Sequence, residues 1–98
     1  MFATVAVFSM PRALRAQQLQ TLSKVVIPSI KTMVGFVRGS WCADADDDAH
    51  VVHVEWIDEG SALRFRDFVR ARMSTPNPEQ VTLVSFQVTQ IIAHEEAA

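Results

Sequence analysis

The feature that most constrains the fold is the alternation of two periodicities along the 98 residues. In residues 11–33 and 61–73, apolar side chains recur every three or four positions, as on the buried stripe of an amphipathic helix. Other stretches are β-branched, aromatic or alternating, which is typical of strands. These stretches are residues 2–9, 36–42, 50–57 and 81–92. The predicted order is therefore strand, helix, strand, strand, helix, strand.

Local signals predict where the helices begin and end. Pro11 has a backbone dihedral suited to a first helical turn, so the first helix is expected to begin there. Pro28 disfavours helical geometry at Ile27, and the helix is expected to kink or stop at this point and resume as a short turn. Asp58 is placed to cap the second helix, Ser61 to Met73.

Two helices inserted between strands of one antiparallel sheet cover only one of its faces. The sequence thus predicts one domain over residues 1–98 with an α+β, ferredoxin-like fold, β-α-β-β-α-β. The side chains expected under the helices are Val37, Trp41, Val52, Val54, Trp56, Val84, Phe86 and Val88. Those expected on the other face are Arg38, Ser40, His53, Glu55, Ser85, Gln87 and Thr89, interspersed with Phe36, Val51, Ile57, Leu83 and Ile91. Such a mixed face suits packing against a second sheet, which predicts a homodimer.

The composition of the chain argues against nucleic-acid and membrane partners. The formal net charge is −2 and the isoelectric point is about 5.8, which gives no long-range attraction to nucleic acid or anionic lipid. No apolar run approaches the roughly 20 residues needed to span a bilayer, and no positive residue precedes the first apolar run. We therefore expect a soluble, cytoplasmic protein without nucleic-acid or membrane partners.

Two segments resemble a known family. Residues 33–41, MVGFVRGSW, look like the helix-exit turn and second strand of antibiotic-biosynthesis-monooxygenase-like proteins in the dimeric α+β barrel superfamily. Residues 52–59, VHVEWIDE, are similar to the third strand of that group, which ends in Trp before the second helix. The resemblance implies a dimer formed by sheet-to-sheet packing and a pocket between sheet and helices in each protomer. Known members include cofactor-free oxygenases, haem-degrading enzymes and proteins with no assigned reaction.

The chain departs from two subgroups of this family. Haem-degrading relatives use a histidine on the second helix and an asparagine on the first strand, and residues 61–73 and 2–9 contain neither. The resemblance therefore implies no haem and no other cofactor. The polyketide oxygenases rely on tyrosine, tryptophan and asparagine, whereas this chain has no tyrosine and has its single asparagine, Asn77, in an expected loop.

The strongest candidate for proton transfer is a polar cluster on the second and third strands. Hairpin pairing brings His53, Glu55 and Arg38 onto one face, where a carboxylate can orient an imidazole. The alternative is a satisfied polar cluster at the dimer interface. His50 and His53 lie three residues apart, hence on opposite faces, so they are not expected to share a metal ion.

The acidic turn at residues 44–48 has two interpretations. Asp44, Asp46, Asp48 and Glu55 have the spacing of oxygen ligands in a calcium loop, but Ala49 replaces its glycine and strands replace its flanking helices. We therefore expect a solvated turn and no metal.

Two hypotheses about function follow. The first is a cofactor-independent monooxygenase-like enzyme that holds an apolar or aromatic small molecule against Trp41, Trp56, Phe65 and Phe68, with His53 in proton transfer. The second is a dimeric small-molecule-binding or assembly protein without catalysis.

Overall fold

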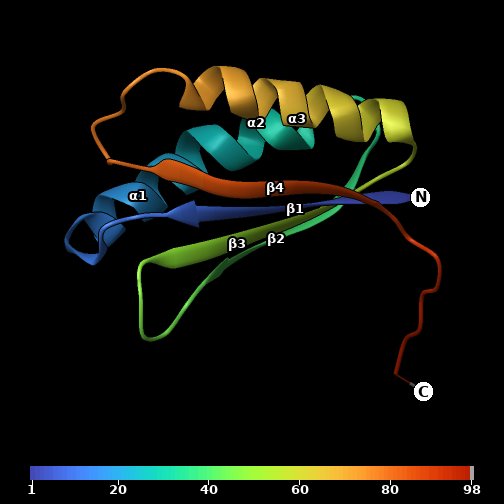
Figure 1. Ribbon diagram of the computed structural model, residues 1–98, viewed down its shortest axis with the longest axis horizontal. Coiled ribbons are helices and arrows are strands. Elements are labelled where there is room, and N and C mark those ends of the chain that lie inside the picture. The colour runs from blue at the N-terminus through green and yellow to red at the C-terminus, as the bar shows by residue number, and fades with distance from the viewer. Residues whose placement is uncertain (98) are drawn as a thin grey trace.

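The computed structural model describes residues 1–97 as an antiparallel sheet with helices over one face (Figure 1). The four strands are β1 (Phe2–Ser9), β2 (Phe36–Ala43), β3 (Ala49–Trp56) and β4 (Thr82–Gln90). Their order across the sheet is β2-β3-β1-β4, so β3 and β1 are central. The predicted ferredoxin-like α+β fold is confirmed.

The first helical region changes its winding along its length. It consists of a 3-10 turn η1 (Arg12–Leu14), helix α1 (Arg15–Thr21), a π-helical turn η2 (Leu22–Val26) and helix α2 (Ile27–Lys31). The Ile27 N–H donates to the Leu22 carbonyl five residues earlier, and Ile27 keeps helical dihedrals. The expectation that Pro28 disfavours helical geometry at Ile27 is wrong, because the wider π turn accommodates a proline that has no N–H to donate.

Helix α3 (Glu59–Met73) begins as the sequence predicts. The Ser61 N–H donates to the Asp58 carboxylate at 2.8 Å, which caps the helix. Gly35, at φ 85°, passes so close to this turn that a Cβ there would overlap the Ser61 side chain. Among residues 1–97, no helix combines the length and apolar character that crossing a membrane requires.

The core lies between the helices and the sheet. Trp56, Val54 and Phe65 are almost completely buried there. The Trp56 indole N–H donates to the Thr4 hydroxyl at 3.1 Å, so the one polar atom of this large side chain has a partner inside the core.

Two β-bulges make part of the prediction wrong, because they change which side chains lie on which face of the sheet. In β2 the pairing with β3 shifts between Phe36 and Arg38, and in β4 Leu83 and Ser85 pair with adjacent residues of β1. Each shift inserts one residue and reverses the alternation before it. Val37 and Val84, predicted under the helices, are therefore exposed, by 38% and 64%. Phe36 and Leu83, predicted on the other face, pack against the core instead.

The assignment of the polar side chains to the open face, the side of the sheet without helices, is confirmed. Arg38 pairs with Glu55, and Ser40 with His53, across β2 and β3. Ser85, Gln87 and Thr89 face the same side from β4, through their pairing with alternate residues of β1.

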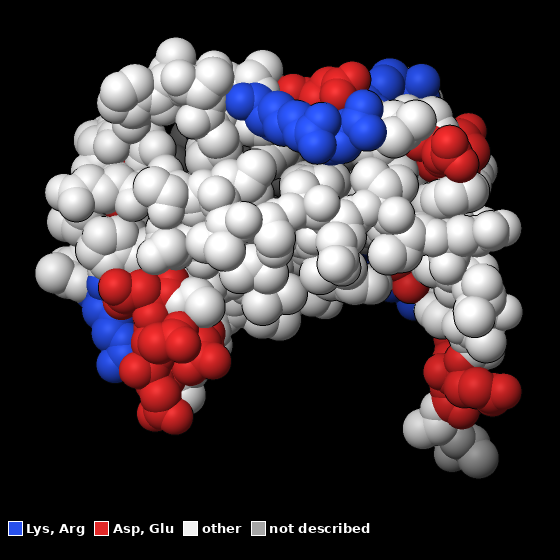
Figure 2. Space-filling model, in the orientation of Figure 1, with Lys and Arg blue, Asp and Glu red and all other residues white. Residues whose placement is uncertain are grey.

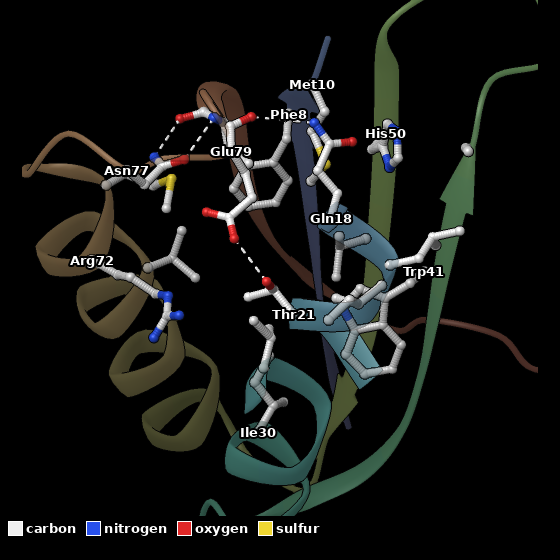
Figure 3. A pocket seen from close by; sticks show the side chains of 18 of the residues that line it. Phe8, Met10, Gln18, Thr21, Ile30, Trp41, His50, Arg72, Asn77 and Glu79 are labelled. Carbon is white, nitrogen blue, oxygen red and sulfur yellow. Dashed lines mark hydrogen bonds between the residues drawn. The ribbon is translucent and has the colours of Figure 1, made fainter. Parts of the chain in front are cut away.

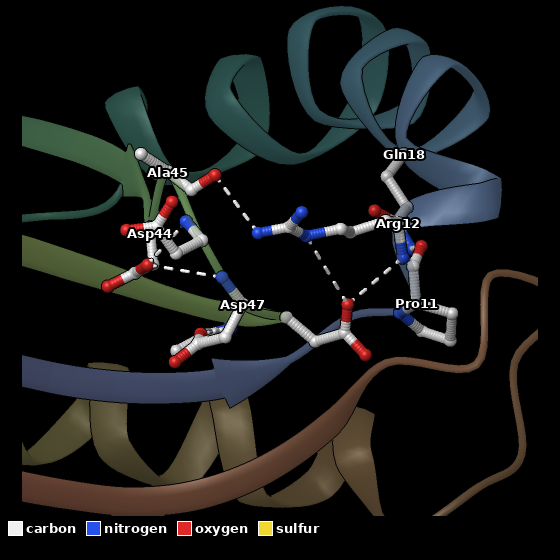
Figure 4. A network of polar contacts seen from close by, with 9 residues as sticks. Pro11, Arg12, Gln18, Asp44, Ala45 and Asp47 are labelled. Atoms are coloured by element: carbon white, nitrogen blue, oxygen red, sulfur yellow. Dashed lines mark hydrogen bonds and ion pairs between the residues drawn. The ribbon is translucent and has the colours of Figure 1, made fainter.

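The β2–β3 turn projects from the open side of the sheet and is closed by its own polar groups (Figures 1 and 4). The Asp44 carboxylate accepts from the N–H groups of Asp46 and Asp47, at 2.8 and 3.2 Å. Arg12 ties the turn to the segment after β1, because its guanidinium donates to the Ala45 carbonyl at 3.0 Å. Among residues 1–97, no three His, Cys, Asp or Glu side chains gather as a metal site would require.

Candidate functional site

A cavity of about 420 Å³ lies between the helices and the covered face of the sheet (Figure 3). This volume is within the range of small-molecule sites, roughly 300–1,000 Å³. Helices α1, α2 and α3, the π turn and strands β1, β2 and β3 all contribute to its wall. Its apolar lining includes Phe8, Ile30, Trp41, Val52, Phe65 and Phe68.

Of the four aromatic side chains predicted to hold a ligand, three line the cavity and one lies in the core. Trp41, Phe65 and Phe68 line the cavity. Trp56 does not line it, because it is fully buried beneath Phe65, with ring centroids 5.0 Å apart. A ligand in the cavity would therefore touch the first three rings but not Trp56.

Gly39 makes room for the indole of Trp41. A Cβ at Gly39 would approach the Trp41 ring to 2.8 Å and a Val54 methyl to 3.4 Å. The ring thus lies over a glycine of its own strand, and a larger residue at position 39 would displace it.

One end of the cavity carries two buried polar side chains, Gln18 from α1 and His50 from β3. Period-two alternation places His50 on the same face as Val52, Val54 and Trp56, so this position was readable from the sequence. Gln18 lies among several similar residues on α1, and no sequence signal distinguishes it. Neither residue was predicted from the sequence to line the cavity.

The surroundings of His50 favour its neutral form. Burial lowers the pKa of His50 below its ordinary value, the positive charge of Arg15 lowers it further, and Asp48 acts in the opposite direction. A neutral imidazole can accept a proton near pH 7, which a charged one cannot.

The loop between α3 and β4 closes over the cavity and is tied to α1. The Thr21 hydroxyl donates to the Glu79 carboxylate at 2.7 Å, and the Gln18 amide donates to the Glu79 carbonyl at 3.2 Å (Figure 3). Asn77 closes the loop on itself, since its side chain bonds both the N–H and the carbonyl of Val81. Arg72 adds a positive charge to the same wall.

The predicted proton-transfer cluster lies on the open face, outside the cavity. The Arg38 Nε and Glu55 Oε2 atoms are 2.6 Å apart, and His94 Nε2 lies 3.1 Å from Glu55 Oε1. His53 is exposed and pairs with Ser40 and Val5 across the sheet. The structure thus brings Arg38 and Glu55 together and adds His94. Among residues 1–97, His53 shares their face but forms no ion pair with either.

The cavity does not fit haem held from the second helix. The α3 side chains that line it are Phe65, Phe68, Val69, Arg72 and Met73, none of which is an imidazole. The cavity histidine belongs to β3.

No family model matches the chain, and a search by sequence finds no similar curated protein. Solved structures match its fold. MhuD, a haem degrader from Mycobacterium tuberculosis solved with two haems in its active site, has a TM-score of 0.74 at 8% identity, over 98% of this chain and 100% of its own. HapK from Hahella chejuensis has a TM-score of 0.73 at 12% identity, over 100% and 99%.

A monooxygenase from Streptomyces coelicolor, solved in complex with nanaomycin D, has a TM-score of 0.61 at 21% identity, over 98% of this chain and 92% of its own. These matches run over nearly the whole length of every chain. The chain therefore has the same fold as these solved proteins, among them a haem degrader and a monooxygenase.

Proposed function

We propose that the chain binds a small aromatic molecule in its cavity and oxidises it with dioxygen, as a cofactor-independent monooxygenase-like enzyme. The observation that carries this proposal is a largely apolar cavity with an aromatic wall and one buried imidazole. The fold supports it, because a monooxygenase and a haem degrader have similar structures.

The proposed reaction needs one proton acceptor from the chain and a cavity that holds the ring. His50 accepts the proton of a ring hydroxyl, and the resulting electron-rich ring reduces dioxygen. One oxygen atom enters the substrate, and the other leaves as water with two hydrogen atoms that the substrate supplies. Trp41, Phe65 and Phe68 hold the ring and exclude water.

An oxygen-uptake assay on a panel of phenols and hydroquinones tests this proposal. We expect His50→Ala to slow uptake by roughly 100-fold or more, the usual contribution of a general base. The control is Lys31→Gln, an exposed change on α2, which should leave the rate unchanged. The sequence-based alternative, catalysis by His53 with Glu55 and Arg38, predicts instead that His53→Ala abolishes uptake. No uptake with any compound contradicts the enzyme and favours the second hypothesis, a binding protein.

We also propose that a second copy of the chain covers the open face of the sheet. Val51, exposed by 39%, lies on this face beside half-buried Val5 and Val7 of β1. Arg38 and the buried carboxylate of Glu55 neutralise each other there. In such a dimer this ion pair would be a satisfied polar contact of the interface rather than a catalytic group.

A further inference from the structure

The mouth of the cavity carries a positive charge that the proposed reaction does not use. Among residues 1–97, Arg72 is the only lysine or arginine that lines the cavity, and its side chain extends from α3 toward it (Figure 3). Arg72 and Thr75 both line the cavity and are exposed to solvent. The cavity therefore opens to solvent at the C-terminal end of α3, and the guanidinium lies at this opening.

The charge of Arg72 is not neutralised by the rest of the chain. Among residues 1–97, its guanidinium forms no ion pair. Glu79 is the one acidic side chain on the described cavity wall, and its carboxylate instead accepts from the Thr21 hydroxyl of α1 at 2.7 Å. An anion from solution can therefore pair with Arg72 without breaking a contact within the described part of the chain.

The surroundings of the mouth are positive as well. Arg70 lies in the same last turn of α3, and Figure 2 shows basic side chains along the top of the molecule, over the helices. From the first helical region the charge of Arg15 also reaches the cavity, since it lowers the pKa of His50. Positive charges around an opening attract anions to it and repel cations.

The number of charges at the mouth indicates the kind of anion. A carboxylate carries one negative charge, and its two oxygens match the fork of N–H donors on a single guanidinium. A phosphate monoester carries up to two charges, and Arg72 is the only cation on the described wall, where Glu79 would repel a dianion. One arginine beside one glutamate therefore suits a carboxylate better than a phosphate.

We infer that Arg72 makes the cavity selective for ligands that carry a carboxylate, with the carboxylate at the mouth and the apolar body of the ligand inside. Arg72 is then a specificity-determining residue, because the charge-assisted hydrogen bonds that it donates are weaker for a neutral group. The inference rests on the proposed function only in placing the ligand in this cavity. It adds a charged group that oxidation of the ring does not require.

Equilibrium dialysis of the full chain with three ligands of one ring system tests the inference. At about pH 7, 2-naphthoate is anionic, 2-naphthamide has nearly the same shape but is neutral, and 2-naphthylmethylammonium is cationic. We expect naphthoate to bind at least roughly five-fold more tightly than naphthamide, which corresponds to a favourable ion pair near the surface. The ammonium should bind most weakly.

Two arginine variants locate the charge that selects. Arg72→Gln should lower the affinity for naphthoate to that for naphthamide and leave the affinity for naphthamide unchanged. Arg64→Gln is the matched control, because it removes the same charge from the same helix, about 12 Å away along its axis, at a residue that does not line the cavity. The preference for naphthoate should persist in this control.

Dialysis needs no turnover, so the inference and the enzyme fail separately. A preference for naphthoate without oxygen uptake by any phenol supports the inference and contradicts the enzyme. Equal binding of naphthoate and naphthamide by the unsubstituted protein overturns the inference, whether or not Arg72→Gln folds, and so does absence of binding by all three ligands. Tightest binding of the ammonium would overturn it in favour of Glu79, and equal losses in the two variants would overturn the role of Arg72.

Discussion

Strand β3 carries one histidine on each side of the sheet, and the two sides give them different chemistry. His50, on the covered face, is 8% exposed and lies in an apolar cavity that lowers its pKa. His53, on the open face, is exposed beside polar residues. A proton acceptor must be uncharged at the working pH and close to its substrate, and in the proposed function His50 meets both conditions because it lines the cavity.

The charges differ between the two sides as well. Figure 2 shows acidic side chains gathered on two projections at the underside of the sheet, the β2–β3 turn and the C-terminal segment. Between these projections the open face carries Arg38 and Glu55, which are paired with each other. The covered face therefore suits a small apolar ligand, whereas the open face suits a broad, nearly neutral contact with another sheet.

The largest expected effect concerns the covered face. Trp56→Ala should lower the free energy of unfolding by about 3–5 kcal/mol, because it removes a fully buried aromatic side chain and leaves a void. Val51→Ala, on the open side of the same strand, should cost less than about 1 kcal/mol in the monomer. Urea denaturation at low protein concentration measures both. If the two variants lost similar free energy of unfolding, the claim that the core is packed on the covered face alone would be wrong.

The next effect concerns the open face. Val51→Asp should weaken self-association by roughly 100-fold or more, because it buries an unpaired charge in the proposed interface while leaving the protomer folded. Val34→Asp is the matched control, since Val34 is exposed by 76% in the turn before β2. Sedimentation equilibrium gives both association constants. A variant that associates like the control would show that another surface forms the dimer.

The smallest effect is a change in the pH dependence of stability. The pKa of His50 is lower in the folded chain than in the unfolded chain, where it is near 6.5. The unfolded state therefore binds more protons between the folded pKa and 6.5, and stability falls as the pH drops through this window. Above 6.5 the contribution of His50 is constant.

His50→Asn should flatten that part of the curve, whereas His53→Asn should leave it in place. Denaturation midpoints between about pH 5 and 7.5 measure the difference. A slope that survives His50→Asn and disappears in His53→Asn would assign the shifted group to the open face.

The order of elements was predictable because each had a strong local signal, such as the Asp58 cap or the alternation from Val52 to Trp56. The errors have a common cause. One extra residue at Val37 and another at Val84 reversed the alternation, and a bulge depends on the pairing of two strands rather than on the sequence of one. The π turn escaped prediction for a similar reason, since the residues before Pro28 keep an ordinary helical pattern.

The site was less predictable than the fold. Periodicity predicted that Trp41, Phe65 and Phe68 face the core, and all three line the cavity, but their contact with a ligand stays a prediction. Gln18 became visible only through its bonds to Pro11 and to Glu79, which lies 61 residues away. Such a position depends on tertiary contacts that local patterns do not encode.

The most direct test of the account is a titration of histidine side-chain NMR signals with 2-naphthol. The account predicts that the imidazole resonances of His50 shift on binding while those of His53 and His94 stay in place. Shifts at His53 with an unperturbed His50 would place the ligand on the open face and contradict it.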